Sequence, residues 1–145
     1  MKRILFSLFL ITTPVKGRDL GQWANTDPAI REWYRHLMIP GLPTHPCCGE
    51  ADAYWCDDYY VRDGHTFCKI TDDRPDEPLK RPHVPVGTEI AIPDYRMKHS
   101  DGNPTGHTIV FLKPLERVTF YDPDIFPSFG NNDYLVYCFV LNGGV

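Results

Sequence analysis

The sequence lacks an apolar run long enough to cross a membrane as a helix. Its longest run of this kind, Ile4 to Thr13, spans about ten residues, whereas a bilayer core about 30 Å thick needs about 20. No second long apolar run follows, and no lipobox cysteine lies near the N-terminus. We therefore expect a mature protein with neither a membrane span nor a lipid anchor.

That short run belongs to a segment with the residue order of a secretory signal peptide. Lys2 and Arg3 form a basic region before it. Val15 and Gly17 are small enough for positions −3 and −1 of a cleavage site. We predict that residues 1–17 are a signal peptide and that the mature protein resides in the periplasm or outside the cell. An uncleaved N-terminal anchor is the alternative.

Basic charge is scarce once this segment is removed. The chain has 15 Lys and Arg against 19 Asp and Glu, and the removed segment holds Lys2, Arg3 and Lys16 but no acidic residue. The remaining 12 basic and 19 acidic residues give a net charge of −7, which repels nucleic acid and anionic lipid. We expect no nucleic-acid partner, while a cationic partner and a merely solvated acidic surface both remain open.

Internal repeats and low-complexity segments are absent as well. The 128 residues left after cleavage suit one domain with one core, and we assign 18–145 to a single disulfide-supported domain. The 14 prolines and 11 glycines indicate many turns, and the aromatic residues supply apolar area for a core.

One segment, 27–38, predicts a helix. Asp27 can cap its N-terminus and Pro28 suits the first helical position. Pro40 and Gly41 follow it and end it. Apolar residues recur every three or four positions and predict one buried face, made of Ile30, Trp33, Tyr34, Leu37 and Met38.

The rest of the chain predicts short strands. Asp63-Gly64 is typical of a type I′ turn, which joins strands over 55–62 and 65–71 and places Tyr59 opposite Cys68. Further strands are expected at 88–92, 108–112, 118–121 and 134–141. The fold class is α+β and mainly β: a small antiparallel sheet or partly open barrel with one N-terminal amphipathic helix.

Five cysteines remain after cleavage, and in an exported chain they are expected to form disulfides. An odd number leaves at least one thiol outside the pairs. Cys138 is expected to bond to Cys47 or Cys48, and a strained bond between Cys47 and Cys48 is the alternative. A regular hairpin points Cys56 and Cys68 to opposite faces, so only a bulge or a break before Cys56 would let them bond.

The densest cluster of chemically active side chains offers a metal site as one alternative. It consists of His45, Cys47, Cys48 and Asp52, and imidazole and thiolate suit zinc or copper. The spacing is not that of a structural zinc site, and export favours oxidised thiols, so we assign neither a metal nor any other cofactor.

A cysteine hydrolase is the enzymatic alternative. Cys48 could open a short helix, and His107 begins an apolar strand later in the chain. This order, with an imidazole to activate a thiolate, resembles papain-like peptidoglycan endopeptidases. Those enzymes follow the cysteine with a long apolar helix, whereas acidic residues follow Cys48 here, and no third, orienting residue is evident.

Acidic residues crowd the proline-rich loop 72–85. Calcium needs six to eight converging oxygens, but Arg74, Lys80 and Arg81 would compete for the carboxylates. We expect a solvated loop crossed by salt bridges.

Aromatic residues gather in and beside the predicted hairpin over 55–71. They are too many for a single core to bury, because a strand alternates its side chains between two faces. Exposed aromatic side chains on a rigid sheet bind glycans or proteins. The expected contact surface combines the Cys47-Cys48 segment with Tyr54, Trp55, Arg81 and His83.

Several stretches carry a family resemblance: CCGEADAYW at 47–55, DDRPDEPL at 72–79, RPHVPVGT at 81–88, NPTGH at 103–107, and Tyr137-Cys138 with the GGV end. Together they resemble a family of small, uncharacterised exported proteins of alphaproteobacteria. No activity is assigned to that family. Cys56 and Cys68 depart from its pattern, and the resemblance implies that they bond to each other, against the regular hairpin register.

These observations favour a non-enzymatic binding or structural module of the bacterial envelope. Its partner is expected to be an envelope protein or glycan. The hydrolase and the metal-binding protein are the alternatives.

Overall fold

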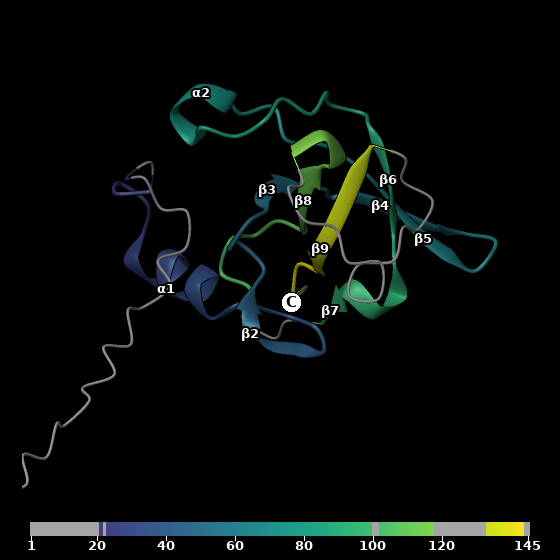
Figure 1. The fold of residues 1–145 in the computed structure, drawn as a ribbon, viewed down its shortest axis with the longest axis horizontal. Helices are drawn as coiled ribbons and strands as arrows, with labels where there is room; N and C mark the ends of the chain where they lie inside the picture. The colour runs from purple at the N-terminus through teal and green to yellow at the C-terminus, as the bar shows by residue number, and fades with distance from the viewer. Residues whose placement is uncertain (1–20, 22, 100–101, 118–132, 144–145) are drawn as a thin grey trace, which may run out of the picture.

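The computed structural model describes residues 21, 23–99, 102–117 and 133–143. A four-stranded sheet lies at its centre, in the spatial order β3-β8-β9-β7 (Figure 1). Its antiparallel members are β3 (Asp52–Trp55), β8 (Ile109–Pro114) and β9 (Tyr134–Val140), and β7 (Met97–Lys98) joins β9 in parallel.

The two inner strands, β8 and β9, are apolar along most of their length because both faces of the sheet are covered. Side chains alternate between those faces. Val110 and Leu112 join one core cluster, while Ile109 and Phe111 join the other. The described residues therefore form two hydrophobic cores, one on each face of this sheet.

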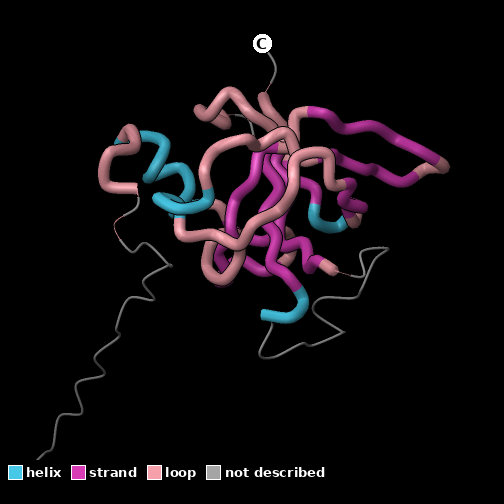
Figure 2. Tube along the Cα trace, turned by 90° about the horizontal axis from the view of Figure 1, so that it is seen from above, coloured by secondary structure: helices cyan, strands magenta, loops and turns pink. Residues whose placement is uncertain are grey.

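A second sheet has three strands in the order β4-β5-β6. These are β4 (Asp58–Arg62), β5 (His65–Lys69) and β6 (Glu89–Ile92). Asp63 and Gly64 both have positive φ, 53° and 77°, as a type I′ turn requires. The predicted register is confirmed, because Tyr59 lies opposite Cys68. The β4–β5 hairpin projects away from the body in both views (Figures 1 and 2).

The N-terminal helix α1 (Pro28–His36) covers one core. The Asp27 carboxylate accepts a hydrogen bond from the Ala29 N–H at 2.7 Å, as a helix cap does. The Tyr34 ring meets Phe111 edge-on, with ring centroids 5.8 Å apart. The helix is shorter than predicted, since Leu37 is extended and the next residue begins a strand. The predicted stripe is mostly half-buried, because α1 lies at the margin of the core.

That strand is β1 (Met38–Ile39), which pairs with β2 (Leu42–Pro46) in a two-stranded sheet. The turn between them uses Gly41, whose φ of 78° suits glycine. This small hairpin leads directly to residues 47–50, which we call the cysteine segment. The Cys47 N–H donates to the Leu37 carbonyl at 2.8 Å.

Short helical turns complete the described chain. They are α2 (Asp76–Leu79), η1 (Asp94–Arg96) and η2 (Leu115–Arg117). The strand predicted over 55–62 is interrupted, since β3 ends at Trp55 and β4 begins at Asp58. Strands predicted at 88–92, 108–112 and 134–141 are confirmed within two residues at each end, while 118–121 lies outside the described residues.

The fold is thus α+β and mainly β, as predicted, and its described strands form open sheets with no closed barrel. No helix among the described residues is long and apolar enough to span a membrane. The predicted signal peptide, 1–17, lies outside those residues.

Candidate functional site

The cysteine segment after β2 is bonded to the central sheet. Cys47 forms a disulfide with Cys138 of β9, 91 residues away in sequence. Both residues are fully buried. Cys48 is the free thiol, so the Cys47–Cys48 bond considered as an alternative does not form.

The second disulfide joins Cys56 to Cys68. The regular hairpin ladder ends at the pair Asp58–Lys69, before it reaches Cys56. The Cys56 N–H instead donates to the Thr108 carbonyl at 2.8 Å, which makes Cys56 a continuation of β3 rather than of β4. The break before Cys56 therefore allows the bond that a regular hairpin would forbid.

The free thiol of Cys48 lies in a half-buried position. Its sulfur approaches the Tyr34 carbonyl at 3.5 Å, as a donor. Burial raises the pKa of the Cys48 thiol above its ordinary value. Since the thiolate is the reactive form, this surrounding makes Cys48 a poor nucleophile.

We expect slow alkylation of Cys48 by iodoacetamide in the native protein at pH 8. The rate constant should be at least about tenfold below that of the same thiol in urea, because burial limits both access and thiolate population. Peptide mass spectrometry of quenched time points measures both rates. Equal rates, or faster reaction in the native state, would contradict this reading of the site.

The predicted metal ligands are not available as a set. Cys47 is consumed by its disulfide, and the His45 ring pairs with the Thr44 hydroxyl at 3.1 Å. Within the described ranges, no group of three or more His, Cys, Asp or Glu side chains gathers as a metal site would require.

His107 lies in surroundings that differ from those of Cys48. Its Nδ1 pairs with an Asp57 carboxylate oxygen at 2.8 Å, and the other oxygen of that carboxylate accepts the Thr108 N–H at 2.7 Å. Cys48 hydrogen-bonds to the Tyr34 carbonyl instead, so the two side chains share no hydrogen-bond partner. The predicted Cys48–His107 pair is not assembled as a nucleophile and its base.

Trp55 is one of the predicted contact residues, and its indole is sandwiched. The His107 ring stacks on it, with centroids 3.8 Å apart and planes 12° apart. The Arg74 guanidinium lies over the same ring at 4.0 Å. Two planar groups this close cannot share one face, so both faces of the indole are covered and neither can stack on a sugar.

Behind Trp55 lies a buried ion-pair network. The Arg81 side chain is 3% exposed and the Asp72 side chain 0% exposed, and their nearest atoms are 2.5 Å apart. Asp72 also accepts two hydrogen bonds from the Arg74 side chain and one from the Trp55 N–H. Burial alone would raise the pKa of Asp72, but the hydrogen bonds from Arg74 and Arg81 outweigh it and hold that pKa well below its usual range.

Two predicted contact residues therefore cannot form a surface. Tyr54 is 1% exposed and donates its hydroxyl to the Pro82 carbonyl at 2.6 Å, and Arg81 is buried against Tyr54 and Asp72. Of that set only His83 is well exposed, where it pairs with Asp76 at 2.6 Å. The loop is crossed by salt bridges as expected, but its central pair is buried rather than solvated.

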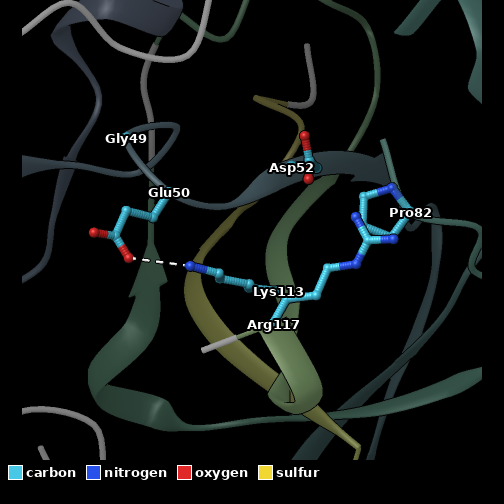
Figure 3. Close-up of a pocket in the computed structure, with 6 residues that line it drawn as sticks. All are labelled: Gly49, Glu50, Asp52, Pro82, Lys113 and Arg117. Atoms are coloured by element: carbon cyan, nitrogen blue, oxygen red, sulfur yellow. Dashed lines mark hydrogen bonds and ion pairs between the residues drawn. The ribbon is translucent and has the colours of Figure 1, made fainter. Parts of the chain in front are cut away.

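The structure does bring the cysteine segment and the Arg81–His83 loop together, around a small pocket of about 210 Å³ (Figure 3). Gly49 and Glu50 come from that segment. A side chain at Gly49 would press against Pro46, because an added Cβ would lie 3.0 Å from the proline ring. The pocket is lined by Gly49, Glu50, Asp52, Pro82, Lys113 and Arg117.

Charges of both signs surround this pocket. Lys113 of β8 reaches the Glu50 carboxylate, with 3.3 Å between the charged atoms, and Tyr137 donates to the same carboxylate at 3.5 Å. Arg117 extends from η2 toward Pro82 (Figure 3). No motif in the sequence marks Lys113 or Arg117 as a site residue, and the only signal for Lys113 is a charge at the end of an apolar run.

Comparison with known proteins gives no relative: no family model matches the chain, and neither a curated protein nor a solved structure is significantly similar to it.

Proposed function

We propose that this chain is an exported binding module of the bacterial envelope that holds a small zwitterion, such as a free amino acid or a dipeptide, in the pocket beside Glu50. The carrying observation is that two carboxylates and two basic side chains line one cavity. Its two disulfides are of the kind found in exported proteins, and the signal-peptide pattern of residues 1–17 predicts the same location.

The charge pattern favours a ligand that carries both signs. Lys113 and Arg117 suit a carboxylate, while Glu50 and Asp52 suit an ammonium group. A neutral sugar carries no charge for these groups to bind, and the covered faces of Trp55 remove the usual stacking platform.

The volume limits the size of the bound group. Pockets for drug-sized ligands measure about 300–1,000 Å³, and this one measures about 210 Å³. It therefore suits a ligand of the size of an amino acid or a dipeptide.

Two links hold the backbone on two sides of the pocket, and a preformed site has a lower entropic cost of binding. The Cys47–Cys138 disulfide holds the segment that carries Gly49 and Glu50. The bond from the Tyr54 hydroxyl to the Pro82 carbonyl ties the opposite wall to the buried network. These links support a binding role, and the contact of Cys48 with the Tyr34 carbonyl does not favour the hydrolase.

The test is an NMR titration of the mature protein with the dipeptide alanyl-alanine, its N-acetyl form and its C-terminal amide. We expect shifts at the pocket residues with the free dipeptide and at least about tenfold weaker binding by each blocked form, because a charged hydrogen bond contributes about 1.5–3 kcal/mol. Arg117→Met and Glu50→Gln should weaken binding of the free dipeptide similarly.

Arg35→Met is the matched control, because Arg35 is an exposed arginine on α1 that pairs with Glu32. It should leave the titration unchanged. Equal binding of the blocked and free dipeptides, or shifts that avoid the pocket, would refute the proposed ligand chemistry.

A further inference from the structure

The outer strand of the three-stranded sheet, β4, has an open edge. Within the part of the chain that the structure describes, β4 pairs with β5 on one side and with no strand on the other. It belongs to the hairpin that projects from the body (Figure 2). An edge strand of this kind offers its unpaired N–H and C=O groups to another strand.

The turn determines which backbone groups face that edge. In a hairpin with a two-residue loop, the residues that flank the loop, Arg62 and His65, exchange both hydrogen bonds. Hydrogen bonding to the partner strand then alternates along β4. The N–H and C=O groups of Tyr59 and Val61 consequently point outward, toward the open edge.

The same two residues carry exposed apolar side chains. Tyr59 is 46% exposed and Val61 is 69% exposed. They lie on one face of β4 because they are two positions apart. In an isolated molecule these apolar side chains remain in contact with water. A second strand paired with the open edge would bury them.

We propose that β4 pairs antiparallel with β4 of a second copy of this chain, about a two-fold axis at Tyr60. In this register Tyr59 lies opposite Val61 of the partner subunit, so that the outward-facing backbone groups meet and the exposed apolar side chains pack together. Asp58 lies opposite Arg62 of the partner subunit at both ends of the pairing. The two three-stranded sheets become one continuous six-stranded sheet.

Charge complementarity selects a second copy as the occupant. Strand DYYVR has opposite charges at its two ends, so only an antiparallel copy brings both ends into attractive pairs. Asp58 already lies near Lys69, at 4.0 Å, and Arg62 near Glu89, at 3.0 Å. Dimerisation therefore extends an alternating row of charges across the new strand pair.

Other registers of the β4–β4 pairing are less favourable. A shift by two residues in either direction would move Asp58 away from Arg62 of the partner subunit, and Tyr59 would no longer lie opposite Val61 of the partner subunit. A two-fold interface buries the same patch on both subunits, which fits one edge strand on each. The pocket beside Glu50 is not part of this interface, so the inference does not depend on the proposed function.

The experiment is sedimentation velocity on the mature protein and on two charge reversals, D58R and R62D. Each reversal alone places like charges opposite each other in a homodimer, and we expect at least about a tenfold rise in dissociation constant. The D58R chain carries two positive residues on β4 and the R62D chain two negative ones. An equimolar mixture should therefore form a heterodimer as stable as the wild-type dimer.

Val61→Lys supplies a second disruption that leaves Asp58 and Arg62 in place, and Val86→Lys is its control because Val86 is 61% exposed elsewhere. Circular dichroism confirms that each variant is folded. A wild-type protein that stays monomeric up to about 1 mM, the limit of weak affinity, would overturn the proposal. So would a mixture of the two reversals that remains monomeric, or a V86K variant that dissociates as readily as V61K.

Discussion

Replacing Cys47 and Cys138 together by alanine should lower the free energy of unfolding by about 4.6 kcal/mol. This loss should exceed the loss from removing the other disulfide, Cys56–Cys68. The Cys47–Cys138 bond closes a loop of 91 residues, and the cost of closing a loop in the unfolded chain rises with its length. Cys56 and Cys68 close a loop of 12 residues, for which the same chain-entropy relation gives about 2.8 kcal/mol.

The two pairs form a matched comparison because all four cysteines are fully buried. Loss of packing should therefore be similar in both double variants, and the difference between them reports on loop length. Urea unfolding followed by fluorescence measures both free energies, with Cys48→Ala in every protein to prevent thiol exchange. A loss for the Cys56–Cys68 pair equal to or above that for Cys47–Cys138 would contradict the expectation.

Local chemistry made the hairpin and the helix start predictable. Two residues, Asp63 and Gly64, determine the turn and hence the register of β4 and β5. Asp27 and Pro28 define the start of α1 for a similarly local reason. The end of α1 was predicted less well, because Met38 is drawn into pairing with Pro46, a tertiary choice that helical periodicity does not report.

The choice between Cys47 and Cys48 could not be made from the sequence. Adjacent cysteines have equivalent access to a distant partner until the backbone direction is known. In the fold, Cys47 is fully buried against Cys138, while Cys48 faces Tyr34. The sequence predicts the break before Cys56 only as a requirement for the second disulfide. The break itself follows from the pairing of Cys56 with Thr108, a contact between residues far apart in the sequence.

The candidate pocket shows the same limit. The sequence indicates the cysteine segment and the Arg81–His83 loop as contact regions, and the structure brings both to one cavity. The sequence also indicates Tyr54 and Arg81 as contact residues, although both are buried. Lys113 reaches Glu50 across 63 residues of sequence, and no local pattern reports a contact of that range.

Asp72→Asn should be the most damaging single substitution in the described chain that leaves side-chain volume nearly unchanged. It removes the carboxylate charge beside Arg81, whose side chain is 3% exposed. Breaking one partner of a buried ion pair costs about 3–5 kcal/mol. We expect about 3 kcal/mol, because Asp76 still accepts from Arg81 at 2.9 Å. Glu32→Gln, in an exposed pair on α1, is the control and should leave the unfolding curve close to that of the wild type, because water screens exposed ion pairs.

The effect of Asp72→Asn should also depend on pH with a defined sign. The pKa of Asp72 is lower in the folded state than the value of about 3.9 expected for the unfolded chain, so below neutral pH the unfolded state binds the proton first. The contribution of the charged carboxylate is thus complete above about pH 5 and is lost as the pH falls below about 4. The stability difference between wild type and D72N should therefore shrink in acid. Urea unfolding from pH 7 down to pH 2 measures it, and a difference that stays constant or grows would mean that the buried carboxylate is not what stabilises Arg81.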